Sequence, residues 1–173
     1  MAIATWAKAT GKREQINTAF RHLAAAPTSA GAGITLEANA SFGDLALRET
    51  RCTLCMACVG LCPTGALKNR EGALALAQQD CVQCGLCMRA CPEKAIDLVS
   101  CFSGDPQTLV GERTLKAASE WFHCVSCATP FAPRSLVEGS IAHVSHHPMF
   151  QGEGRRLLEM CPVCRRKASA GMA

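Results

Sequence analysis

The chain has 173 residues, of which 13 are cysteine, and its formal net charge is +4. This length accommodates one ordinary domain or two small ones, and small domains often depend on bound metal for their stability. No stretch approaches the roughly 20 consecutive apolar residues that a membrane-spanning helix needs, so no membrane span is expected.

The segment from Met1 to Ala26 carries no recognisable export signal, because charged residues interrupt the apolar runs. These charged residues are Lys8, Lys12, Arg13, Glu14 and Arg21. A secretory signal needs a continuous apolar segment after a basic start. Cysteine-rich secreted proteins form disulfides, whereas clustered cysteines in a reducing compartment bind metal. We therefore expect a cytoplasmic protein whose cysteines hold metal.

Residues 4–26 are predicted to form one helix. Ile16, Phe20 and Leu23 recur at the i, i+4 and i+7 spacing of a single helical face, and a proline ends the pattern. A helix that packs on its own chain is the simpler interpretation, and a docking helix for a partner subunit is the alternative. Residues 24–33 are small and turn-forming, which indicates a linker.

An internal repeat follows a segment of short extended stretches at residues 34–51. The sequence CTLCMACVGLCPTGAL at residues 52–67 returns as CVQCGLCMRACPEKAI at residues 81–96, with every cysteine and both prolines in matching positions. The repeat indicates a duplication with pseudo-twofold symmetry. Each half is predicted to contain a loop, a short helical turn after the proline, and a strand. The predicted strands are residues 73–77 and 95–99, and the turn between the halves is residues 69–72.

Both halves contain the spacing C-x2-C-x2-C-x3-C-P, in which the fourth cysteine serves the other iron–sulfur cluster. Three cysteines two residues apart surround one cubane on a tight loop, and the fourth lies on a turn that the proline begins. We expect Cys52, Cys55, Cys58 and Cys91 to bind cluster I, and Cys81, Cys84, Cys87 and Cys62 to bind cluster II. Zinc knuckles built from the same thiolates are the alternative, although zinc sites usually use two separated pairs.

Residues 44–100 resemble the 2[4Fe-4S] bacterial-type ferredoxin family at all eight ligand positions. The resemblance implies an α+β fold with a ferredoxin-like βαββαβ dicluster domain and one-electron transfer at low potential. We expect an N-terminal helix and linker at residues 1–33 and the dicluster domain at residues 34–101. A change in composition then predicts a four-cysteine metal-binding module with a basic tail at residues 102–173.

Two further cysteine pairs lie in this last segment. Cys124 and Cys127 form one C-x2-C pair, and Cys161 and Cys164 form the other. Two such hairpins suit a tetrahedral structural zinc ion, as in a zinc ribbon, and the chain between them merely closes the loop. A rubredoxin-like mononuclear iron, a third iron–sulfur cluster and unmetallated thiols are the alternatives. The remaining cysteine, Cys101, is predicted to be a buried free thiol.

Four histidines in the last segment are expected to be ordinary surface or packing residues, because four cysteines already complete a zinc site. These histidines are His123, His143, His146 and His147.

The positive formal charge is not taken as a sign of nucleic-acid binding. Each [4Fe-4S] cluster or zinc ion with four thiolates carries about −2, so the fully loaded protein would have a net charge of about −2. Glu153 and Glu159 interrupt the basic residues near the C-terminus, and the chain has no tyrosine. Proteins that bind single-stranded nucleic acid typically stack bases on aromatic side chains beside a basic groove.

The order of these motifs along the chain is similar to the C-terminal region of proteobacterial 4Fe-4S proteins associated with formate dehydrogenase and other molybdenum or tungsten oxidoreductases. The matching segments are GKREQINTAFRHL, SFGDLALRETRCTLCMACVGLCPTGAL, CVQCGLCMRACPEKAI, WFHCVSCATPF, HHPMF and RRLLEMCPVCR. The resemblance implies a stand-alone electron-transfer subunit that serves such an enzyme.

No glycine-rich phosphate loop and no nucleophile with its base are evident in the sequence, so the protein is not expected to be an enzyme. Flavin, NAD or pterin would belong to a partner, such as a molybdenum or tungsten oxidoreductase or a flavin- or NAD-linked subunit. A structural or assembly factor for a metalloenzyme, and a redox-sensing regulator that binds nucleic acid, are the alternative functions.

Overall fold

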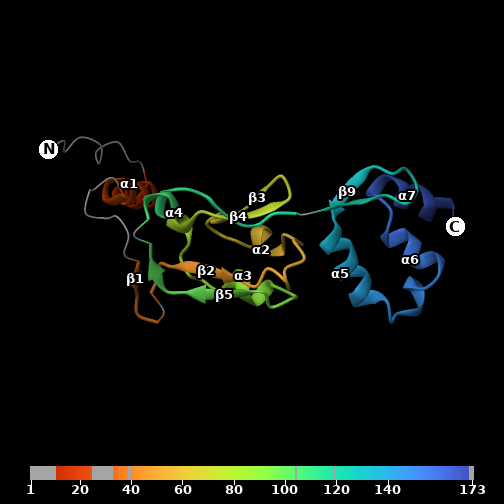
Figure 1. Ribbon diagram of the computed structural model, residues 1–173, viewed down its shortest axis with the longest axis horizontal. Helices are drawn as coiled ribbons and strands as arrows, with labels where there is room; N and C mark the ends of the chain where they lie inside the picture. Colours follow the sequence, from red (N-terminus) through yellow and green to blue (C-terminus); the bar gives the residue numbers. More distant parts are fainter. Residues whose placement is uncertain (1–10, 25–32, 39, 104, 119, 172–173) are drawn as a thin grey trace. The chain divides into compact units, whose positions relative to one another are not determined.

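The computed structural model describes residues 11–24, 33–38, 40–103, 105–118 and 120–171 (Figure 1). Contacts between these residues divide the chain into two compact units. Unit 1 takes in most of the residues up to Leu115, and unit 2 takes in those from Lys116 onward together with residues 52–55 and 71–73. In the described part of the chain, no helix has both the length and the apolar character that crossing a membrane requires.

Helix α1, Lys12–Ala24, opens unit 1 and packs on it through one aromatic side chain. The ring centroid of Phe20 lies 4.8 Å from that of Phe42 and 6.0 Å from that of Phe102. Phe42 and Phe102 also contact each other, with their centroids 5.7 Å apart. Ile16, which the helical pattern places on the same face, is 46% exposed. The buried face of α1 is therefore narrower than the apolar face that the sequence predicts.

Polar contacts fix the same helix to the loop before the second cysteine motif. Asn17 Nδ2 donates a hydrogen bond to Asp80 Oδ1 at 3.1 Å, and Arg13 Nη2 donates to the Asp80 carbonyl oxygen at 2.9 Å. These contacts favour the interpretation of α1 as a packing helix. The rest of the predicted helix and the predicted linker, at residues 4–10 and 25–32, lie outside the described residues.

Replacing Phe20 with alanine should loosen α1 without disturbing the metal sites. Phe20 is half-buried, so we expect a loss of about 2 kcal/mol, below the 3–5 kcal/mol typical of a fully buried phenylalanine. That loss lowers the hydrogen-exchange protection of residues 12–24 about thirtyfold. Ile16→Ala, an exposed change on the same helix, is the matched control and should cost less than about 0.5 kcal/mol. Equal effects of the two changes would contradict the packing role of Phe20.

The sequence repeat is also a structural repeat. The first half contains β2 (Asp44–Leu47), α2 (Ala57–Gly60) and β3 (Leu67–Arg70). The second half contains β4 (Ala73–Leu76), α3 (Leu86–Ala90) and β5 (Ile96–Val99). Every element of the second half begins at the same distance along the chain from its counterpart in the first, and that distance equals the displacement of the cysteines. The six elements therefore follow the order strand, helix, strand, strand, helix, strand.

The two halves are joined by their strands. β2 of the first half pairs antiparallel with β5 of the second, with Leu45 opposite Leu98. β3 and β4 form a hairpin, and β7 (Arg113–Lys116) completes a sheet of order β3-β4-β7. The two halves share one core, whose inward side chains are each at most 4% exposed: Leu45, Leu67, Leu74, Leu76 and Ile96.

The turn predicted at residues 69–72 is shorter than expected, because strand β3 was not foreseen. The turn consists of Glu71 and Gly72, with φ angles of 53° and 88°. Two successive residues with positive φ form the mirror-image turn that matches the twist of a two-residue hairpin. The polar sequence Lys68 to Arg70 concealed this strand, of which only Leu67 is buried.

The helical turns predicted after each proline are wrong in position. The short helices α2 and α3 come before the prolines and carry the third cysteine of each motif, Cys58 and Cys87. After the prolines the chain turns at Gly65 and Lys94, with φ angles of 66° and 48°. This reversal is needed because the following backbone N–H groups must face back toward the sulfur of the fourth cysteine.

The remaining elements of unit 1 are short. β1 (Ile34–Thr35) pairs antiparallel with β6 (Cys101–Phe102), and α4 (Pro106–Val110) follows β6 in the chain. The 3-10 turn η2 (Gln78–Asp80) lies between β4 and α3. Cys101 lies in β6 and is half-buried rather than buried, because the two-residue strand β1 covers only part of it. Desolvation by this partial burial raises the pKa of the Cys101 thiol.

Unit 2 begins with an antiparallel hairpin and continues as helices. The hairpin strands are β8 (Trp121–His123) and β9 (Pro130–Pro133), in which Phe122 pairs with Ala132. The helical elements are α5 (Arg134–Val144), the 3-10 turn η3 (Pro148–Phe150), α6 (Glu153–Leu158) and α7 (Pro162–Gly171).

Candidate metal centres

Four cysteines of unit 1 line a single pocket. Three of them, Cys81, Cys84 and Cys87, come from the second motif, and the fourth, Cys62, comes from the first. The apolar wall of the pocket includes Leu45, Leu76 and Leu98. Thiolates in an apolar surrounding are the ligands that iron–sulfur clusters use.

Two residues with a left-handed backbone conformation bend the loop of the second motif. Gln83 and Gly85 have φ angles of 54° and 74°, and their counterparts in the first motif, Leu54 and Met56, have 58° and 59°. A left-handed conformation costs a non-glycine residue roughly 1–2 kcal/mol and persists where the surroundings enforce it. The recurrence of this conformation at equivalent positions fits loops shaped to present their backbone N–H groups to a bound cluster.

The fourth cysteine of each motif accepts backbone hydrogen bonds. For Cys62, burial alone would raise the pKa, but the N–H groups of Leu67, Thr64 and Ala66 outweigh burial, and the pKa of the thiol is lowered. At the equivalent place in the other half, Ala95 N donates to Cys91 Sγ at 3.3 Å. Donors of this kind stabilise a thiolate, which is the form that binds metal.

Two other sulfurs of the pocket behave differently. Burial raises the pKa of Cys81 and of Cys87, so without metal these thiols hold their protons at neutral pH. Thiolates at such buried positions need nearby positive charge, which the irons of a cluster would supply. The donor set therefore fits a metal cluster better than it fits free thiols.

The two motifs also match in the exposure of their second, third and fourth cysteines. The second cysteine of each motif, Cys55 or Cys84, is exposed, whereas the third, Cys58 or Cys87, is buried. Clusters are shielded from water by burial, and solvent exposure is one of the factors that set their potentials. Cys55 and Cys84 are therefore the ligand positions at which solvent would come nearest to each cluster.

Gln83 is a residue that spacing alone did not identify as part of this site. Its Nε2 donates to the Asp44 carbonyl oxygen at 3.0 Å and lies 3.6 Å from Cys81 Sγ. A donor to a cluster sulfur stabilises the reduced, more negative state. The sequence signal would have been a polar amide between two cysteines in a loop where the first motif has leucine.

Replacing Gln83 with leucine should lower the reduction potential of one cluster by on the order of tens of millivolts, because the amide donor near Cys81 is lost. Potentiometric titration followed by EPR measures the potentials of both clusters in the same sample. The cluster bound by the other motif is the internal control and should keep its potential. Equal shifts at both clusters, or a shift at neither, would rule out this role for Gln83.

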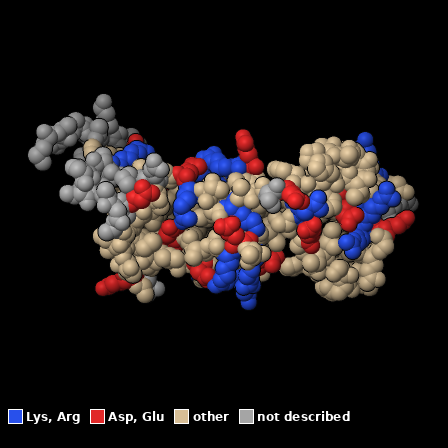
Figure 2. Space-filling view, in the orientation of Figure 1, with Lys and Arg blue, Asp and Glu red and all other residues tan. Residues whose placement is uncertain are grey.

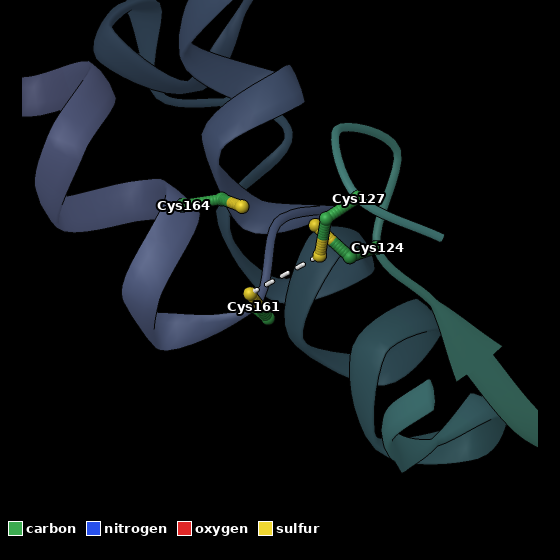
Figure 3. Close-up of side chains that lie close together, drawn as sticks. All are labelled: Cys124, Cys127, Cys161 and Cys164. Carbon is green, nitrogen blue, oxygen red and sulfur yellow. Dashed lines mark hydrogen bonds between the residues drawn. The ribbon is translucent and has the colours of Figure 1, made fainter. Parts of the chain in front are cut away.

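The four cysteines of unit 2 form a much tighter group. All four sulfur atoms of Cys124, Cys127, Cys161 and Cys164 lie within 4.8 Å of one another (Figure 3). The sulfurs of Cys127 and Cys161 are 3.8 Å apart. Ligands about 2.3 Å from a tetrahedral ion are separated by about 3.8 Å from one another. The spacing fits a single ion, whereas a cubane would spread four thiolates over four iron atoms.

The first pair is held by the hairpin turn between β8 and β9. Ala128 has a φ angle of 58°, and its N–H donates to the Cys124 carbonyl oxygen at 2.8 Å. The Ser126 N–H donates to Cys124 Sγ at 3.4 Å. Backbone donors in such a turn orient the sulfur atoms and stabilise their negative charge.

The second pair is not on a hairpin, which corrects the zinc-ribbon expectation. Cys161 immediately precedes α7, and Cys164 lies in the first turn of that helix, which begins at Pro162. Residues three apart lie on the same side of a helix, so both sulfurs face the hairpin. The pattern C-x2-C alone does not distinguish a hairpin from the start of a helix, although the proline between the cysteines is typical of a first helical position.

A small hydrophobic core includes two of these cysteines. Cys124 is 3% exposed, Met160 and Cys161 are 8% exposed, and Phe131 and Leu157 pack against them. The Arg165 side chain ties the preceding loop to α7, because its Nε donates to the Leu157 carbonyl oxygen at 2.7 Å. The positions of the sulfurs are therefore fixed by packing and hydrogen bonds.

Without a cation the pKa values of Cys124 and Cys164 differ widely. Burial would raise the pKa of Cys124, but backbone N–H groups of Cys161, Cys127 and Ser126 outweigh it and lower that pKa to about 6. A hydrogen bond with Cys127 raises the pKa of Cys164 to about 12. Metal binding at pH 7 must therefore expel the Cys164 proton, so affinity for metal rises as the pH rises.

The four histidines of this region lie outside the sulfur group. His147 Nδ1 accepts a hydrogen bond from Met149 N at 3.3 Å, and His143 Nδ1 lies 3.0 Å from the Gly139 carbonyl oxygen. His123 and His146 are exposed.

Comparison with known families places a 4Fe-4S dicluster domain at residues 51–96, a segment that contains both repeated motifs. No curated protein matches the chain. The chain is thus a mixed helix and strand protein with a 4Fe-4S dicluster domain and a four-cysteine group near its C-terminus. Such domains carry out iron–sulfur electron transfer and are typical of electron carriers rather than of catalytic enzymes. An association with formate dehydrogenase stays a prediction.

Proposed function

We propose that this protein is a one-electron carrier or electron-transfer subunit with two [4Fe-4S] clusters that share ligands between its duplicated halves. The observation that carries the proposal is the pocket in unit 1, where Cys62 of the first motif joins Cys81, Cys84 and Cys87 of the second. The spacing rule of bacterial ferredoxins requires this exchange of the fourth cysteine.

The arrangement of strands and helices supports a bacterial-ferredoxin topology for this domain. The order strand, helix, strand occurs twice at one constant displacement, and the first strand of one half pairs with the last strand of the other. This pairing brings the ends of the repeat together, as a pseudo-twofold βαββαβ domain requires. We propose residues 34–101 as this domain, residues 1–33 as an N-terminal helix with its linker, and residues 102–173 as the C-terminal module.

Cluster II would be held by the four cysteines of the unit 1 pocket, and cluster I by Cys52, Cys55, Cys58 and Cys91. Each cluster would supply a centre that accepts or gives up one electron. The chain itself contributes burial, backbone donors to the sulfurs and a fixed loop conformation. These are the factors through which a protein sets a cluster's potential.

The ion in unit 2 is proposed to be zinc. The close spacing of the four sulfurs favours one ion over a third iron–sulfur cluster, and mononuclear iron is the remaining alternative. Zinc has no redox activity, so the ion would stabilise unit 2 and take no part in electron transfer. The sulfur group joins the β8–β9 turn to the start of α7, so an ion bound there would crosslink these two segments of unit 2.

The partner is proposed to be a cytoplasmic oxidoreductase. The similarity of the motif order to formate-dehydrogenase-associated 4Fe-4S proteins supports a molybdenum or tungsten enzyme, and a flavin- or NAD-linked subunit would serve the same purpose. Such a partner would supply the substrate chemistry, because an iron–sulfur domain passes single electrons and performs none of it.

Rapid redox kinetics test this function. The protein, purified without oxygen, should be reduced and reoxidised by one-electron carriers faster than about 10 per second, the median turnover rate of enzymes. Stopped-flow absorbance near the broad iron–sulfur band measures both rates. Clusters that cannot be reduced, or that exchange electrons far more slowly than enzymes turn over, would contradict a role in electron transfer and favour an assembly factor.

A further inference from the structure

Four basic side chains surround a hollow on the surface of unit 1. The hollow has a volume of about 430 Å³, and we name it the cationic basin. Its lining residues are Arg48, Arg51, Met88, Arg89, Cys91, Lys94, Ile96 and Asp97. Figure 2 shows Lys and Arg side chains gathered in this region, over α3 and β5. The basin is thus built from the residues that follow β2, from α3 and the loop after it, and from the start of β5.

The charges of the basin do not cancel. Among the described residues that line it, Asp97 is the one acidic residue, and it forms an ion pair with Arg48. Arg89 Nη2 donates to the Cys84 carbonyl oxygen at 3.1 Å, which neutralises no charge. Arg51 and Lys94 are exposed. An excess of three positive charges therefore faces solvent around the hollow.

Part of the lining of the basin is apolar. Met88, which is 38% exposed, lines the hollow, and so does Cys91, the proposed fourth ligand of cluster I. Protein interfaces typically combine a central apolar patch with a polar rim, and both methionine and arginine are enriched in them. The lining of the basin contains both methionine and arginine, and it includes a proposed cluster ligand.

We propose that the cationic basin is the docking site for an acidic one-electron carrier protein, with electrons passing through the side of the domain that carries Cys91. The proposal rests on the proposed function and names the surface and the charge of its partner. Charge complementarity argues for an acidic partner, because opposite potentials steer association and fix the orientation of the complex.

The chemistry of the basin favours an acidic protein over a nucleic acid. In the described part of the chain no aromatic side chain lines the basin, so these residues offer no surface on which bases could stack. Met88 offers an apolar contact that a phosphate backbone does not use. The redox step is a single-electron exchange in which one partner is oxidised as the other is reduced, with no proton transferred and no bond formed or broken.

Stopped-flow electron exchange with two carriers of opposite charge tests the proposal. Flavodoxin serves as the acidic one-electron carrier, and cytochrome c serves as the basic one. The holoprotein should react with flavodoxin at a rate that falls at least tenfold between ionic strengths of about 0.01 M and 1 M, over which the Debye length shortens from about 30 to 3 Å.

Reversing two charges of the basin isolates its contribution. Arg51→Glu combined with Lys94→Glu should slow the reaction with flavodoxin about tenfold or more at low ionic strength and speed the reaction with cytochrome c. Arg166→Glu combined with Lys167→Glu changes the same residue types on α7 and serves as the matched control. The control should alter both rates less than about threefold. Iron content and EPR spectra of both variants should match those of the unmodified protein.

The outcomes separate this proposal from the proposed function. Equal slowing by the basin variant and the control variant, or a flavodoxin rate independent of salt, would overturn the docking site while leaving electron transfer intact. A holoprotein that exchanges electrons with neither carrier would instead contradict the proposed function. Salt-dependent binding of a duplex DNA fragment that the basin variant abolishes, with an unchanged flavodoxin rate, would assign the basin to nucleic acid and also overturn the docking proposal.

Discussion

Cys62→Ala should remove the [4Fe-4S] signal of cluster II and leave cluster I in place, although Cys62 belongs to the first cysteine motif. Three of the four ligands remain, but the pocket in unit 1 would lack one thiolate that a four-iron cubane requires. The integrated EPR signal of the fully reduced protein should fall from about two to about one [4Fe-4S] spin per chain.

Paired substitutions distinguish shared from separate ligand sets. Adding Cys84→Ala to Cys62→Ala should change little further, because both residues would serve cluster II, so about one spin per chain should remain. Adding Cys55→Ala instead should abolish both signals. Cys55 and Cys84 are matched controls, since both are exposed and occupy equivalent places in their motifs. The opposite pattern would show that each motif binds its own cluster.

Cys161→Ala should release the ion of unit 2 without affecting electron transfer. We expect the zinc content to fall from about one to near zero per chain and hydrogen-exchange protection across residues 121–171 to fall sharply, because structural zinc contributes several kcal/mol to folding. The iron content and both cluster potentials should stay unchanged.

Cys101→Ala is the matched control for this loss. Cys101 is half-buried in β6 of unit 1 and lies outside the group of four sulfurs, so its replacement should leave the zinc content unaltered. A drop in iron content when Cys161 is replaced, with no loss of zinc, would contradict the structural zinc site and favour mononuclear iron.

Much of the candidate site could be predicted from the sequence because cysteine spacing encodes ligand geometry directly. The constant displacement between the two cysteine motifs anticipated that the chain folds as a structural repeat, although it did not anticipate strand β3 or the positions of α2 and α3. The two C-x2-C pairs anticipated the group of four sulfurs in unit 2. Such motifs are informative because few backbone arrangements can bring thiolates at this spacing to one metal centre.

Other features depend on contacts that spacing does not record. Strand β3 carries a polar sequence, and its pairing with β4 decides its conformation. The second C-x2-C pair starts a helix rather than a hairpin, because Pro162 and the residues after it favour α7. The cationic basin brings together residues after β2, in α3 and at the start of β5, and the pairing of β2 with β5 makes the first and last of these segments neighbours.

Quantitative analysis of iron, zinc and acid-labile sulfide, on protein purified without oxygen, tests the two-cluster assignment on which the proposed function depends. We predict about eight irons, eight sulfides and one zinc per chain, with two interacting [4Fe-4S] signals in the EPR spectrum of the reduced protein. A colourless protein without sulfide would contradict this assignment, and so would a protein that carries zinc alone at all three cysteine sites.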